Sequence, residues 1–170
     1  MSLFDSLHQF LNTGGDVLWV ILGVSICLWS LIVERFIYFK QAYPVQRAYW
    51  LSTWEEQPNK SSQQALFIRD SIISEAKISM KKTVPIIKML VALCPLLGLL
   101  GTVTGMIHVF DVMAVTGTGN ARAMASGVSQ ATIPTMAGMV IAIAGLYFSK
   151  LIEQRVSDET HHLTDLLQYH

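Results

Sequence analysis

The polar side chains that could do chemistry in this sequence are few and lie inside long apolar stretches. Thr102 lies in the uncharged stretch 89–110, and Gln130 and Thr135 lie in the uncharged stretch 123–149. A hydroxyl can both donate and accept a hydrogen bond, and an amide in an apolar environment needs protein or water as its partner. The three residues together could line a partly hydrated path. Alone, each hydroxyl more often bonds a carbonyl of its own helix one turn back.

Neither stretch contains Asp, Glu, Lys or Arg. A proton relay inside a membrane normally needs an ionisable group at depth, so a titrating acid would have to come from another chain. On antiparallel helices, the helical rise puts Thr102 about 13 Å inside Asp111 and Gln130 about 12 Å inside Arg122. We therefore expect these two residues at similar depth, with Thr135 nearer the middle of its helix.

The elements that position these residues are predicted to be three membrane-spanning helices. The uncharged runs contain 17, 22 and 27 residues, and a spanning helix needs about 20 mostly apolar residues. We place the spans at 16–39, 89–111 and 123–149. A cleaved signal peptide is the rival interpretation of the first run. It is disfavoured because Asp5 and Asp16 precede the run without any Lys or Arg, and no small-residue cleavage site follows.

The basic residues predict the orientation of these spans. The segment 40–88 carries eight Lys and Arg residues, whereas the segment 112–122 carries Arg122 alone. By the positive-inside rule the N-terminus is periplasmic, and the C-terminus is cytoplasmic. Residues 1–170 then form a single membrane domain, all α-helical, with long cytoplasmic helical extensions: a loop and amphipathic helix over 40–88 and a C-terminal helix over 150–170. Residues 112–122 form a short periplasmic loop.

Small residues recur at helical spacing in the second and third spans. Such residues let membrane helices approach closely, which is ordinary helix packing or a surface facing partner helices. Pro134 removes a backbone donor and can kink the third span or only shape its packing. The predicted helix-packing or partner-facing residues are Gly98, Gly101, Gly105, Gly127, Ala131, Pro134, Gly138, Ala142 and Gly145.

Composition and motifs argue against several functions. Hydrophobic residues make up 52% of the chain, and the twelve basic and twelve acidic residues cancel, so no basic field favours nucleic acid. Phosphate-binding loops, nucleophile elbows and HExxH motifs are missing from the sequence, and the pair His161-His162 has no matching ligand cluster. Cys27 and Cys94 lie in apolar runs. We expect no enzyme, cofactor, metal or nucleic-acid partner.

Two sequence motifs together resemble the MotA/TolQ/ExbB proton-channel family, and the ExbB branch most. They are PLLGLLGTVTGMI at 95–107 and SGVSQATIPTMAGMVIAIAGL at 126–146. The resemblance implies a homopentamer in the bacterial inner membrane, surrounding an ExbD-like partner whose aspartate carries the proton and powering a TonB-like protein. The family's pore threonines fall on Thr102 and Thr135. Gln130 stands where many relatives have a glutamate, and an amide cannot titrate.

The leading hypothesis is a proton-channel subunit that energises TonB-dependent uptake of iron-siderophore complexes or vitamin B12 across the outer membrane. A TolQ-like subunit for envelope constriction is the nearest alternative. A flagellar stator is less favoured, because stator subunits have four spans and a larger cytoplasmic part. A membrane scaffold that conducts nothing is the alternative from another class, since Thr and Gln also serve packing.

Overall fold

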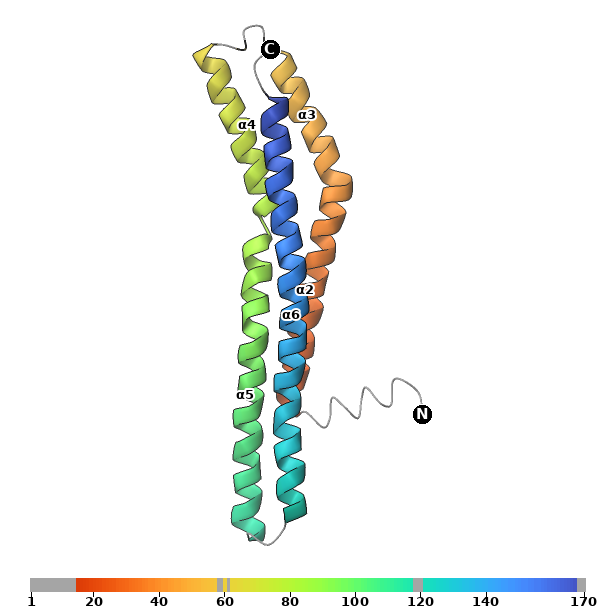
Figure 1. Ribbon diagram of the computed structural model, residues 1–170, viewed down its shortest axis with the longest axis vertical. Coiled ribbons are helices and arrows are strands. Elements are labelled where there is room, and N and C mark those ends of the chain that lie inside the picture. The colour runs from red at the N-terminus through yellow and green to blue at the C-terminus, as the bar shows by residue number, and fades with distance from the viewer. Residues whose placement is uncertain (1–14, 58–59, 61, 118–120, 168–170) are drawn as a thin grey trace, which may run out of the picture. The chain divides into compact units, whose positions relative to one another are not determined.

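The computed structural model describes residues 15–57, 60, 62–117 and 121–167. Within these ranges the chain is helical and contains no strand (Figure 1). Three stretches are long and apolar enough to cross a membrane, at Asp16–Glu55, Gln63–Val115 and Ala121–Leu166. The prediction of an all-α, polytopic membrane protein is therefore confirmed. The elements are α2 (Asp16–Ile37), η1 (Tyr38–Ala42), α3 (Tyr43–Glu55), α4 (Gln63–Lys81), α5 (Val84–Thr116) and α6 (Ala121–Leu166).

The helices extend beyond the predicted spans. α5 begins at Val84, five residues before the expected start of the second span, and ends at Thr116, inside the segment expected to be a loop. α6 is a single helix of 46 residues that continues past the expected third span. The helix ends are therefore poor guides to the membrane boundary. α4 does not run directly into α5, because Lys82 and Thr83 form a turn between them.

The described residues divide into two compact units, and α2, α5 and α6 contribute to both. The first unit contains the described residues up to Trp29 and the segment Lys88–Leu146. The second contains the segment Ser30–Ile87 and the described residues from Tyr147 onward. The predicted site residues all belong to the first unit.

In the first unit, α5 and α6 pack through small residues. Gly138 lies so close to α5 that an added Cβ would come 2.5 Å from the carbonyl oxygen of Cys94. Gly105 faces Ala131 in the same way. Close backbone approach of this kind is how membrane helices associate where lipid removes the hydrophobic drive. The outward faces of these helices carry large apolar side chains instead, among them Val103, which is exposed.

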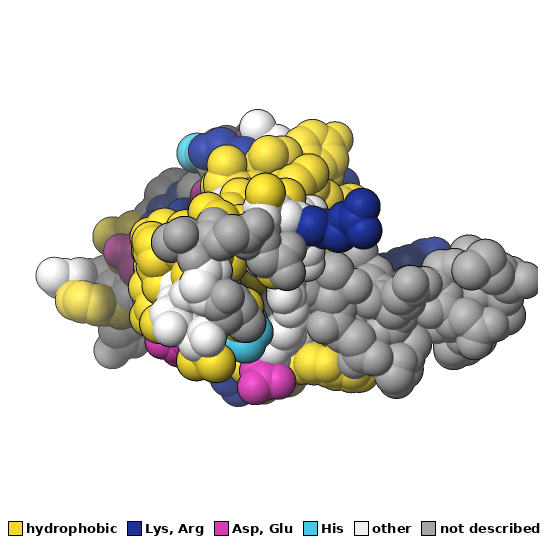
Figure 2. All heavy atoms as spheres, turned by 90° about the horizontal axis from the view of Figure 1, so that it is seen from below, with side chains coloured by type: hydrophobic (Ala, Val, Ile, Leu, Met, Phe, Trp, Pro, Cys, Tyr) yellow, Lys and Arg dark blue, Asp and Glu magenta, His cyan; other side chains and the backbone are white. Residues whose placement is uncertain are grey.

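Hydrophobic side chains make up much of the described surface seen along the helices in Figure 2, and charged side chains there are isolated. In the first unit the exposed apolar residues include Ile26, Leu96, Met136, Val140 and Ile143. A bilayer solvates such a surface, whereas water would not. This exposure agrees with a chain whose spans contact lipid or other membrane helices.

In the second unit, one turn of π-helix joins α2 to α3. The backbone N–H of Tyr43 donates to the carbonyl of Tyr38, five residues back. The next residue, Pro44, has no N–H to donate to Lys40, and its ring would crowd that carbonyl in a regular α-helix. The wider turn relieves this conflict without ending the helix.

Arg35 of α2 is almost fully buried in the second unit, with 4% of its surface exposed. One guanidinium nitrogen, Nη1, donates to the carbonyls of Ser79 and Met80 at distances of 3.1 and 3.4 Å. Nε lies 2.9 Å from a carboxylate oxygen of Glu34. The guanidinium lies over the ring of Tyr38, with Cζ 4.8 Å from the ring centroid. Arg35 thus satisfies carbonyls in the last turn of α4, which lack partners within their own helix.

Candidate functional site

Thr135 links the two helices that carry the predicted site. Its hydroxyl donates a hydrogen bond of 2.8 Å to the carbonyl of Gly98, from α6 to α5. Gly98 permits this approach because an added Cβ there would come 2.9 Å from the Cα of Thr135. The bond is partly buried, and the hydroxyl oxygen keeps the capacity to accept a further hydrogen bond.

Thr102 lies about one turn further along α5 and bonds within its own helix. Its hydroxyl donates to the carbonyl of Leu99 at 2.6 Å. Thr104 does the same toward Leu100 and Gly101, at 3.0 and 3.1 Å. These bonds consume the hydroxyl hydrogens and leave the oxygens as acceptors. The oxygen of the half-exposed Thr102 side chain can therefore accept a hydrogen bond from a donor outside the chain.

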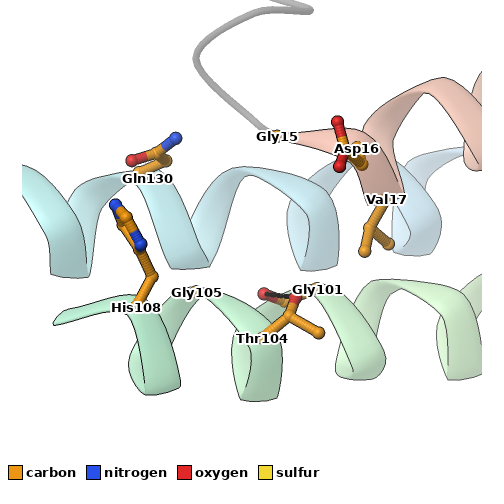
Figure 3. A pocket seen from close by; sticks show the side chains of 8 residues that line it. All are labelled: Gly15, Asp16, Val17, Gly101, Thr104, Gly105, His108 and Gln130. Carbon is orange, nitrogen blue, oxygen red and sulfur yellow. Dashed lines mark hydrogen bonds between the residues drawn. The ribbon is translucent and has the colours of Figure 1, made fainter. Parts of the chain in front are cut away.

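Gln130 lies at a cavity of about 400 Å³ in the first unit (Figure 3). In this view the amide of Gln130 and the ring of His108 lie near each other at one end, and the carboxylate of Asp16 lies toward the other. The cavity is much larger than the roughly 30 Å³ that one water molecule occupies. Its lining consists of Gly15, Asp16, Val17, Gly101, Thr104, Gly105, His108 and Gln130.

The structure does not group the three predicted residues as one cluster. Gln130 shares its cavity with Thr104 and His108, whereas Thr102 is not part of the lining. Thr135 contacts α5 at Gly98 instead. Gln130 shares its cavity with Gly101 and Gly105 of α5, but Gly105 faces Ala131, the neighbour of Gln130, whereas Gly101 faces Pro134. The cavity therefore adds a second polar feature beside the predicted threonines.

His108 lies near the outer end of the predicted second span, and the sequence gives no sign that it shares a cavity with Gln130. Counted from Asp111 and Arg122, His108 lies about 4.5 Å and Gln130 about 12 Å inside the predicted spans, so depth estimated from the sequence argues against a pairing. Asp16 was read only as a charge before the first span. Its place at the cavity depends on how α2 packs, which the sequence pattern does not show.

The small residues of α5 and α6 lie against neighbouring helices of the same chain. Gly101 faces the ring of Pro134, Gly127 faces Val109, and Gly145 faces Val91 and Leu28. Ala131, Pro134 and Ala142 are buried on the same side of α6. These positions therefore lie at contacts between helices of this chain or are buried. A role toward partner helices stays a prediction.

The described residues contain no group of three or more His, Cys, Asp or Glu side chains placed to hold a metal ion. The groups around the cavity are hydroxyl, amide and imidazole groups of α5 and α6 and the carboxylate of Asp16 from α2. Such groups can order water and pass protons, but neither α5 nor α6 supplies a carboxylate to the cavity.

Comparison with known proteins supports the family resemblance that the two sequence motifs indicate. Residues 44–165 match the model of the MotA/TolQ/ExbB proton channel family. ExbB-like 1 of Synechocystis sp., by name a biopolymer transport protein, is 41% identical over 76 residues, which cover 43% of this chain and 30% of that protein. ExbB-like 3 of the same organism is 39% identical over 64 residues, covering 36% and 30%. The chain thus spans about a third of the length of these relatives. It belongs to the MotA/TolQ/ExbB proton channel family.

Proposed function

We propose that this chain is the channel subunit of a proton-driven motor. With an ExbD-like partner, it uses the proton motive force to energise TonB-dependent transport across the outer membrane. The observation that carries the proposal is that α5 and α6 hold polar but uncharged side chains within long apolar stretches. Thr102, Gln130 and Thr135 provide acceptors and donors at depth, and Gln130 adjoins a cavity large enough for water. No Asp, Glu, Lys or Arg interrupts residues 89–110 or 123–149.

The missing acid defines what the partner must supply. An amide and two hydroxyls can order water, but none of them binds a proton near neutral pH. A carboxylate on a partner helix, placed beside Thr102 and Thr135, would complete the path. We propose that an ExbD-like subunit brings this aspartate and that a TonB-like protein takes up the resulting motion.

The exposed apolar faces of α5 and α6 support an assembly of several copies. Met136, Met139, Val140 and Ile143 are exposed on α6, although they belong to a span. We propose a homopentamer in the bacterial inner membrane, in which these faces contact other subunits, partner helices or lipid. Its N-terminus is periplasmic and its C-terminus cytoplasmic, because the basic residues concentrate in 40–88.

The test is proton flux into liposomes that contain the purified chain with or without an ExbD-like partner. We expect flux only when both are present. Thr135→Val should lower that flux, because it removes the hydroxyl that joins α6 to the carbonyl of Gly98. Thr135→Ser keeps a hydroxyl at this position and should keep the flux. Thr132→Val is the matched control, because the Thr132 hydroxyl bonds only the carbonyl of Ser129 in its own helix. Equal flux without the partner, or no binding of the partner, would contradict the proposal.

A scaffold that conducts nothing is the second candidate function. It is favoured by one observation: the hydroxyls of Thr102 and Thr135 both bond helix carbonyls, as hydroxyls that only serve packing do. The same liposomes decide between the two functions, because a scaffold binds the partner without passing protons. Loss of iron or vitamin uptake on deletion, without a division defect, would separate the proposed role from a TolQ-like role.

A further inference from the structure

The second unit contains a cavity of about 460 Å³ with two chemically different ends. Phe36 of α2 and Phe39 and Lys40 of η1 line one side. Three residues of α6, Leu151, Ile152 and Arg155, complete the lining. Four of the six side chains are apolar and two are cationic.

Both walls present these side chains in the same order. Along α2 and η1, Phe36 and Phe39 come before Lys40, and along α6 Leu151 and Ile152 come before Arg155. All six residues lie within stretches that are long and apolar enough to cross a membrane, and on each wall the cation follows the apolar residues within one turn. An amphiphile with an apolar tail toward the bilayer centre and an anionic head beyond it has the matching order.

The charges at the polar end leave a positive excess. Arg155 Nε lies 3.4 Å from a carboxylate oxygen of Glu159, one turn further along α6, and the Arg155 side chain is 64% exposed. Lys40 is exposed and has no ion-pair partner among the described residues. One of the two cations is therefore offset by a carboxylate, and the other is not.

The apolar lining is built from fixed side chains. Ile152 is buried, and Phe36 packs edge-on against Phe148 with ring centroids 6.3 Å apart. The ring of Phe39 lies beside that of Tyr43, with the ring centroids 6.1 Å apart. Such rings give an acyl chain a preformed surface, whereas a free phosphate ion gains nothing from them.

We propose that this cavity binds one anionic phospholipid, with its acyl chains against Phe36, Phe39 and Leu151 and its phosphate between Lys40 and Arg155. Basic pockets at the cytoplasmic ends of membrane helices recognise anionic lipid headgroups in this way. The single uncompensated charge fits a headgroup with one net negative charge, such as phosphatidylglycerol. The site does not depend on proton conduction.

The test is native mass spectrometry of the full chain in detergent, titrated with phosphatidylglycerol or phosphatidylcholine of identical acyl chains. Each basic contact near a membrane surface contributes about a fivefold change in affinity. Lys40→Gln and Arg155→Gln should each weaken phosphatidylglycerol binding by about that factor, and the double variant by roughly 25-fold. Lys150→Gln, which removes an exposed cation of α6 outside the cavity, should change nothing.

A second variant tests the apolar half of the site. Leu151→Trp fills the cavity while both cations remain, so it should also weaken phosphatidylglycerol binding. Unchanged binding in this variant would mean simple surface attraction, and equal binding of phosphatidylcholine would mean no headgroup selection; either result overturns the proposal. Displacement of the lipid by millimolar glycerol phosphate would also overturn the proposal, because it would indicate a site for free anions. If the double variant changes the number of chains per assembly but not lipid binding, this face is a contact between copies, and the proposal is wrong. Lys40→Gln alone is sufficient for the test if the other variants do not fold, because Lys40 is exposed and its replacement should leave the packing unchanged.

Discussion

Gly138→Ala tests whether the close approach of α5 and α6 is rigid. A Cβ at this position would lie 2.5 Å from the carbonyl oxygen of Cys94 and 3.4 Å from the Cα of Gly98. The nearest obstacle is thus backbone, which cannot rotate away as a side chain can. Ordinary contact begins at 3.4 Å, so the helices must separate locally by about 0.9 Å. The nearby bond from Thr135 to Gly98, now 2.8 Å, would stretch with them.

The expected cost follows from three contributions. Forcing an extra methyl group into a well-packed contact costs about 1–3 kcal/mol. Weakening an interhelical hydrogen bond in a membrane protein adds about 0.6 kcal/mol. Alanine is a better helix former than glycine by about 0.9 kcal/mol, which opposes both. Gly138→Ala should therefore lower the free energy of unfolding by about 0.7–2.7 kcal/mol.

Gly23→Ala in α2 is the matched control, because a Cβ there meets nothing within 4 Å. It should be neutral or stabilise by up to about 0.9 kcal/mol. Both variants can be unfolded with SDS in mixed micelles, with helicity as the readout. Because the gain in helix propensity is common to both variants, their free energies of unfolding should differ by about 1.6–3.6 kcal/mol. Equal stabilities would refute the reasoning, since the helices would then be able to separate at no cost.

Three further predictions concern the second unit. Burial, with a smaller contribution from the charge of Glu159, raises the pKa of Tyr43 to about 12. Because the Tyr43 hydroxyl of the unfolded chain loses its proton near pH 10, the free energy of unfolding should fall between pH 10 and 12. Unfolding followed at each pH should show no such fall in Tyr43→Phe. Arg35→Met should lower the free energy of unfolding in urea by about 3 kcal/mol, because it leaves carbonyls of α4 and the carboxylate of Glu34 without this partner. Arg35→Lys should lower it by less, because an ammonium keeps the charge but lacks the guanidinium fork. Ser62→Ala should cost about 1 kcal/mol in the same assay, because the Ser62 hydroxyl caps α4 by accepting from the N–H of Ala65, and Ser62→Asp should not.

The fold class and the family follow from the sequence because their causes are local. Long uncharged runs require spanning helices, and small residues at steps of three and four mark a helix face. The sequence does not identify the partner of that face. Only the packing shows that Gly105 meets Ala131 and that Gly138 meets the backbone of Cys94 within one chain.

The candidate site was predictable only in part. Thr102, Gln130 and Thr135 stand out as polar residues in apolar runs, but their hydrogen bonds depend on which carbonyls lie nearby. The burial of Arg35 shows the same limit. A charge pair at the end of an apolar run resembles a membrane boundary, whereas its guanidinium bonds carbonyls 44 and 45 residues further along the chain.

The π-turn at η1 has a consequence for comparing this chain with its relatives. Between residues 30 and 55, the buried positions are Ile32, Arg35, Tyr43, Trp50 and Trp54, at steps of three, eight, seven and four. Seven residues make about two α-turns, so the step of eight contains one residue too many for an unbroken α-helix. The wide turn absorbs this residue and keeps Tyr43 on the inner face. A relative shorter by one residue between 38 and 42 should therefore be aligned with a gap at this point and an ordinary α-turn in its place, with the buried face unchanged on both sides.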